Sequence, residues 1–155
     1  MIKTISQKAL QELLLQPKRA GTYRLTHDKR QKTLEKAAAG LGFACFKVNF
    51  DEAKETGAIL HVLGRDLGFP HWYGINLDAL YDCLTDFSWQ QAPGYVVFIS
   101  GADALLANRA SFTAINDVFA AAIAQWQRQH IPLWVFYASA SLLPDDAPDS
   151  LPTMT

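Results

Sequence analysis

Three aspartates recur at four-residue intervals in the middle of the chain: Asp78, Asp82 and Asp86. On an α-helix, which advances about 100° per residue, this spacing places all three carboxylates along one side. Like charges four residues apart repel each other by roughly a few tenths of a kcal/mol per pair. Between Asp66 and Gln127 the only Lys or Arg is Arg109, so the local sequence offers no relief. We therefore interpret this acidic ridge as a candidate surface for contacting cations.

The same segment predicts a core-facing side and a helix start. Leu77, Leu80 and Leu84 fall within about 60° of one another on the helical wheel, opposite the acidic ridge. Cys83 flanks these leucines and is expected to be a small buried residue. Asn76 suits the N-cap position, which leaves the first aspartate of the ridge in the first turn, where the helix dipole favours an acid.

Aromatic residues accompany the acidic ridge. Trp72 and Tyr73 precede the helix in a loop, and Tyr81 is expected at the boundary between the core side and the ridge. Trp and Tyr supply large contact areas at low entropic cost, so aromatic side chains beside charges are typical of a protein-binding patch. Two plainer interpretations remain open. The ridge can be an ordinary solvated helix face, and either loop aromatic can simply pack beneath the loop.

The sequence predicts no enzyme activity, no metal and no cofactor. Asp78 and Asp82 are both expected to be exposed, with nothing to raise the pKa of either, as paired-carboxylate catalysis requires. Cys83 lacks the positive surroundings of a catalytic thiol. The cysteines and the four histidines show no metal-ligand spacing, and no nucleotide-binding motif is present. His61 is expected to be a partly buried histidine on an otherwise apolar helix.

Charge is distributed unevenly along the 155 residues, although the net charge is only −1. Residues 1–50 carry a net charge of +7, and residues 51–155 carry −8. The acidic part should repel nucleic acid and attract a basic protein. Binding of RNA to the basic segment is a weaker hypothesis, because acids dilute its cations and Tyr23 is its one aromatic neighbour. No apolar stretch suits a membrane span or a secretory signal, so a cytoplasmic protein without membrane contact is expected.

The elements that must position the acidic ridge alternate between strands and helices, which predicts an α/β fold with a mostly parallel sheet. Three core strands are expected, with a possible fourth from residues 21–25, which would open a β-α-β unit. Cys45 is expected among the packed residues of the second strand. Predicted strands cover residues 21–25, 43–50, 95–99 and 133–137, and predicted helices cover 6–16, 28–39, 56–68, 76–87, 102–107 and 111–129.

Residues 69–86, FPHWYGINLDALYDCLTD, resemble the signature segment of the barstar family, intracellular protein inhibitors of secreted microbial ribonucleases. The resemblance covers roughly residues 43–138 and implies a barstar-like fold. Residues 1–42 then form an N-terminal extension of a single domain that spans 1–138. Residues 139–155, with their prolines and aspartates, are expected to be a flexible tail.

By this resemblance, the acidic helix and its preceding loop plug a ribonuclease active site. Asp82 stands where a substrate phosphate sits and accepts hydrogen bonds from Arg and His residues, and Asp78 contacts a second basic group. Trp72 and Tyr73 pack against the catalytic histidine and the guanine-site loops. Asn76 fixes the loop or bonds across the interface. Bidentate, charge-assisted bonds from Arg to carboxylate make this chemistry strong.

The sequence departs from the family pattern at four positions. Asp86 replaces a frequent Gly, Phe87 stands where Trp is common, Gln125 is neutral where an acid is expected, and His71 replaces an acid. These departures indicate a partner different from the best-known ribonuclease, or a lower affinity for that ribonuclease. Two alternatives stay open: an immunity protein against another basic nuclease toxin, and a docking domain for a basic protein that is not a nuclease.

Overall fold

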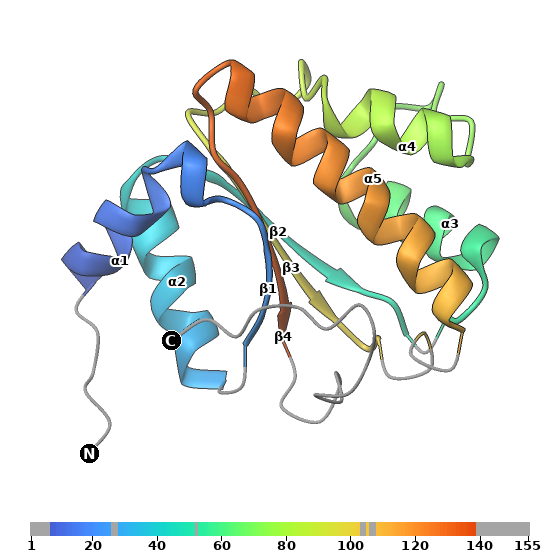
Figure 1. Ribbon diagram of the computed structural model, residues 1–155, viewed down its shortest axis with the longest axis horizontal. Helices are drawn as coiled ribbons and strands as arrows, with labels where there is room; N and C mark the ends of the chain where they lie inside the picture. The colour runs from blue at the N-terminus through green and yellow to red at the C-terminus, as the bar shows by residue number, and fades with distance from the viewer. Residues whose placement is uncertain (1–6, 26–27, 52, 103–104, 106–107, 139–155) are drawn as a thin grey trace.

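The computed structural model describes residues 7–25, 28–51, 53–102, 105 and 108–138. Four parallel strands form one sheet in the order β1-β4-β3-β2. Figure 1 shows α1 and α2 on one side of this sheet and α3, α4 and α5 on the other. The predicted α/β class and parallel sheet are therefore confirmed. The elements are α1 Gln7–Leu14, the 3₁₀ turn η1 Pro17–Arg19, β1 Thr22–Leu25, α2 Asp28–Gly40, β2 Ala44–Asn49, α3 Thr56–Asp66, α4 Leu77–Leu84, β3 Tyr95–Ser100, α5 Arg109–Arg128 and β4 Leu133–Ala138.

β4 and β3 are the two central strands of the sheet. Their side chains are apolar on both faces of the sheet. Residues 95–99 and 133–137 are all buried, as in parallel strands that helices cover on both sides. The possible fourth strand is present: β1 pairs with β4, with Thr22 opposite Val135. The succession β1-α2-β2 does not bring its two strands together, since β1 and β2 lie at opposite edges of the sheet.

Two side chains lie differently from the prediction. Cys45 is exposed rather than packed, because β2 is an edge strand whose residues alternate between partly buried and exposed. His61 is exposed on α3, because the apolar stripe of that helix occupies the other positions. The stripe itself is buried, and it consists of Ile59, Leu60, Val62, Leu63 and, just after the helix, Leu67.

Several boundaries also differ. The first helix stops at Leu14, and Pro17 opens a separate 3₁₀ turn. The long helix begins at Arg109 because the Asn108 side chain caps it, accepting a 3.2 Å hydrogen bond from the Ser111 backbone. The helix expected at 102–107 and the tail from 139 lie largely or wholly outside the described residues. Among the described helices, none combines the length and the apolar character that crossing a membrane requires.

Candidate protein-binding site

The Asn76 side chain starts α4. Asn76 has an extended backbone, and its Oδ1 accepts a 2.7 Å hydrogen bond from the backbone N–H of Ala79. This bond satisfies one of the free N–H groups at the helix start, and Asp78 follows in the first turn. The predicted N-cap is therefore confirmed, and the cap fixes where the loop ends and the acidic ridge begins.

One side of α4 is buried and the other is exposed, as the periodicity predicts. Leu80, Cys83 and Leu84 are fully buried, and Leu77 packs against the core from a partly buried position. Tyr81 is half-buried at the boundary between the two sides. All three carboxylates of the acidic ridge, those of Asp78, Asp82 and Asp86, belong to exposed residues. The helix therefore stands on the core with its acidic ridge toward solvent.

The helix is shorter than predicted, and Asp86 lies outside it. Thr85 is the C-cap, and its hydroxyl donates a 2.8 Å bond to the Tyr81 carbonyl. Phe87 takes a left-handed backbone conformation, with φ of 47°, and turns the chain into the core, where its ring stacks on Tyr95 at 4.6 Å. The acidic ridge therefore consists of two aspartates on α4 and a third in the turn that follows.

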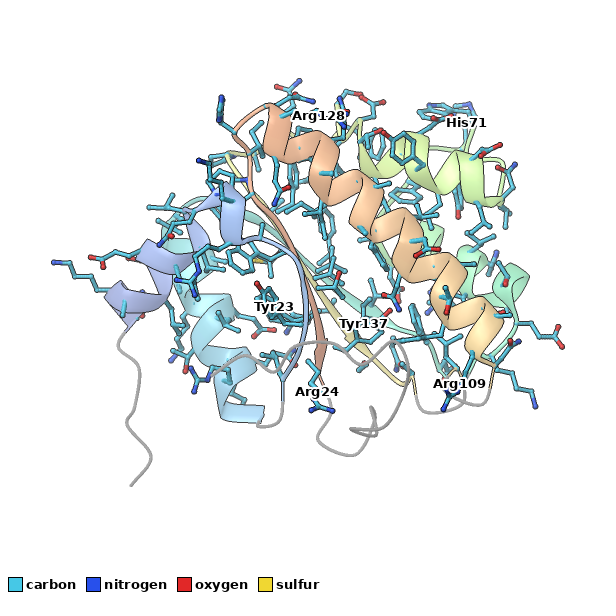
Figure 2. The ribbon with its side chains drawn as sticks, in the orientation of Figure 1. Tyr23, Arg24, His71, Arg109, Arg128 and Tyr137 are labelled. Atoms are coloured by element: carbon cyan, nitrogen blue, oxygen red, sulfur yellow. The ribbon has the colours of Figure 1, made fainter. Side chains whose placement is uncertain are left out.

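No counter-charge relieves the acidic ridge within the described part of the chain. No nitrogen of a described Lys, Arg or His lies within 4.0 Å of these carboxylates. Arg109 and Arg128 lie at opposite ends of α5 (Figure 2), and Arg128 donates instead to Gln125 Oε1 at 3.0 Å. Gln125, at the position expected to hold an acid, therefore leaves that end of α5 without a carboxylate.

The negative field of the acidic ridge acts on Cys83. Burial, and then the charges of Asp82 and Asp86, raise the pKa of the Cys83 thiol to about 11. The thiol is therefore protonated at neutral pH and is not an activated nucleophile. Among the described residues, no group of three or more His, Cys, Asp or Glu side chains is placed to hold a metal ion.

The loop before α4 is anchored by Tyr73. Its hydroxyl donates a 2.9 Å hydrogen bond to the Leu60 carbonyl of α3, and its ring meets Phe69 edge-on at 4.9 Å. Gly64 makes this approach possible, because a Cβ there would lie 2.6 Å from the Tyr73 ring. Burial raises the pKa of Tyr73 to about 12. Tyr73 is thus half-buried and engaged within the molecule.

Trp72 is more exposed than Tyr73, with 53% of its surface accessible. Its ring lies nearly perpendicular to that of Trp89, with the ring centroids 6.1 Å apart, and it packs on no other ring among the described residues. The neighbouring His71 is also exposed, beside α4 in Figure 2. The structure adds Ile75, a residue absent from the predicted site, which is 48% exposed between the loop aromatics and the Asn76 cap. Its sequence signal was a β-branched apolar residue between a glycine and the Asn76 N-cap.

A parallel α/β domain of barstar-like architecture is thus the class that the fold defines. A family model described as Barstar (barnase inhibitor) matches residues 43–138, which is more than half of the chain. The chain belongs to the barstar family, whose members are inhibitors rather than enzymes. The match begins just before β2, so β1 and α2 precede it and still build the same sheet and its cover.

Proposed function

We propose that this protein is a cytoplasmic, non-catalytic inhibitor of a basic, barnase-like ribonuclease. The observation that carries the proposal is the pair Asp78 and Asp82, exposed on α4 without a described cationic partner in a member of the barstar family. Repulsion between these like charges lowers the stability of the free protein. A cationic partner that neutralises the carboxylates removes this repulsion on binding.

In this proposal Asp82 occupies the phosphate position of the ribonuclease. A carboxylate there accepts bidentate, charge-assisted hydrogen bonds from an Arg, and Asp78 meets a second cation one helical turn away. Trp72 contributes exposed aromatic area, and Tyr81 lines the edge of the contact. The charge of the acidic ridge, Asp86 included, steers the basic enzyme toward α4 and speeds association.

Asn76 and Tyr73 serve the contact by holding the loop. The Asn76 oxygen is used by the helix cap, and its Nδ2 donates to the Gly74 carbonyl at 3.4 Å. The Tyr73 hydroxyl is used by the Leu60 carbonyl. Both observations support positioning roles, with the Tyr73 ring edge left for any contact across the interface.

The test is an inhibition titration of barnase and related small secreted guanyl-specific ribonucleases. We expect stoichiometric inhibition by the wild type that weakens as salt rises. Asp82→Ala should weaken inhibition at least a hundredfold, because it leaves buried cations of the enzyme unpaired at a cost of about 3 kcal/mol. Glu12→Ala, which removes an exposed acid from α1 on the other side of the sheet, should inhibit like the wild type.

An Asp82→Ala variant that stays within about threefold of the wild type, roughly 0.6 kcal/mol, would contradict this binding mode. If no guanyl-specific ribonuclease is inhibited, capture from source cells separates the alternatives. Recovery of another basic nuclease supports the immunity function, which the departures at Asp86 and Gln125 favour. Recovery of a basic protein without nuclease activity supports a docking domain.

A further inference from the structure

Two large apolar side chains are exposed in the loop that leads into α4. Trp72 is 53% exposed and Ile75 is 48% exposed, and Leu15 of the α1–η1 junction is the third exposed large hydrophobic among the described residues. Neither Trp72 nor Ile75 belongs to the hydrophobic side chains that pack on the core. Two such residues therefore lie within four positions of the sequence, in the loop directly before the helix that carries Asp78 and Asp82.

The backbone of Ile75 adds a second observation. Its φ is 53°, in the left-handed region, where a β-branched side chain clashes with its own backbone. Gly or Asn adopts this conformation readily, and either would also remove apolar surface from water. Isoleucine therefore strains the backbone of the free protein, and its half-exposed side chain contributes little burial free energy in return. Strained and exposed residues of this kind cluster at ligand-binding positions.

We propose that Ile75 is a specificity-determining contact for the nuclease. Together with Trp72, its side chain inserts into the nuclease surface as an apolar anchor. This inference rests on the proposed function and names the partner more closely. The partner has a cationic cleft for Asp78 and Asp82, and an apolar recess beside that cleft for Ile75. Apolar contacts at the rim exclude water from the charged pairs and so strengthen them. A basic nuclease without the recess should bind less tightly.

The experiment compares variants against the ribonuclease that the wild type inhibits most tightly among barnase and secreted enzymes of its class. Ile75→Asn should raise the inhibition constant about tenfold, as the loss of a buried isoleucine contact predicts. Its thermal unfolding midpoint should stay equal or rise, because Asn relieves the backbone strain. Ile75→Val, which keeps an apolar side chain, should stay within about threefold. Leu15→Asn is the matched control, a similarly exposed apolar residue directly after α1, the helix that lies across the sheet from α4, and should leave inhibition unchanged.

Three results overturn the inference. Ile75→Asn within about twofold of wild-type inhibition shows that the residue makes no contact. Weaker inhibition accompanied by a lower unfolding midpoint shows a structural role instead. Equal losses for Ile75→Asn and Leu15→Asn show a nonspecific effect. If Asp82→Ala abolishes inhibition while Ile75→Asn retains it, this inference alone fails. If the wild type inhibits no enzyme of the class, the proposed function fails as well.

Discussion

The indole Nε1 of Trp126 donates a 2.7 Å hydrogen bond to the backbone carbonyl of Leu84, inside the contact between α5 and α4. The bond is buried, and it satisfies one of the free carbonyls at the end of the helix that carries Asp78 and Asp82. Tyr73 holds the loop at the start of the same helix to α3. The acidic ridge is therefore fixed from both ends by side chains that do not belong to it.

Replacing Trp126 with Phe should lower the free energy of unfolding by about 1–3 kcal/mol, because the Leu84 carbonyl stays buried without its donor. The end of α4 should also loosen, so we expect inhibition to weaken several-fold. Trp134→Phe provides the matched control. Trp134 makes the equivalent buried bond, 3.0 Å to the Leu14 carbonyl, but toward α1 on the other side of the sheet.

Chemical denaturation and inhibition constants, measured on both Trp variants, check this prediction. We expect similar losses of stability in the two proteins but weaker inhibition only for Trp126→Phe. Equal inhibition by the two variants would show that the Trp126 bond stabilises the fold without positioning α4.

The two glycines of α3 allow a paired test of the loop anchor. Gly57 has open space around it, so Gly57→Ala should stabilise the helix by about 0.5–1 kcal/mol. Gly64→Ala introduces a Cβ 2.6 Å from the Tyr73 ring. The Tyr73 ring must then shift, which breaks the hydrogen bond from its hydroxyl to the Leu60 carbonyl. The loop that carries Trp72 and Ile75 then loses its anchor on α3.

We expect Gly57→Ala to inhibit like the wild type and Gly64→Ala to inhibit about tenfold less, a loss of roughly 1.4 kcal/mol of binding free energy. Thermal unfolding of both variants and their inhibition constants provide the measurement. Wild-type inhibition by Gly64→Ala would mean that the loop keeps its place without the Tyr73 anchor.

The local features of the site could be predicted from the sequence, and the long-range ones could not. The Asn76 cap and the burial of Leu80 and Cys83 depend on spacing within one helix, which periodicity reports directly. The end of α4 was placed too late because Phe87 continues the helical pattern, although its ring is drawn out of the helix to stack on Tyr95. Tertiary packing overrides local periodicity at that point.

Two buried hydrogen bonds, one that holds α4 and one that holds α1, join residues far apart in sequence. Leu84 and Trp126 are 42 residues apart, and Leu14 and Trp134 are 120 apart. No local pattern reports such pairs, because only the folded sheet brings them together. The same holds for α1 and β1, which join the core through the Leu14 bond and through the pairing of β1 with β4.

Stability should fall in alkaline solution, because the folded state raises the pKa of buried acids above their values in the unfolded chain. The pKa of Cys83 rises from 9.0 to about 11, and that of Tyr73 from 10.0 to about 12. The unfolded chain therefore releases these protons first as pH rises. The stabilisation is fully present below about pH 9 and is lost progressively between about pH 9 and pH 12.

Denaturant titrations at several pH values, from neutral to about pH 11, measure this loss as a declining free energy of unfolding. Cys83→Ala should flatten the decline that begins near pH 9, and Tyr73→Phe the part that begins near pH 10. Burial also raises the pKa of Tyr95 and of Tyr137, so part of the decline should persist in either variant. Below about pH 8 each variant should show the same shallow slope as the wild type, which serves as the internal control. A Cys83→Ala protein with an unchanged decline above pH 9 would show that the Cys83 thiol ionises as easily in the folded protein as in the unfolded chain.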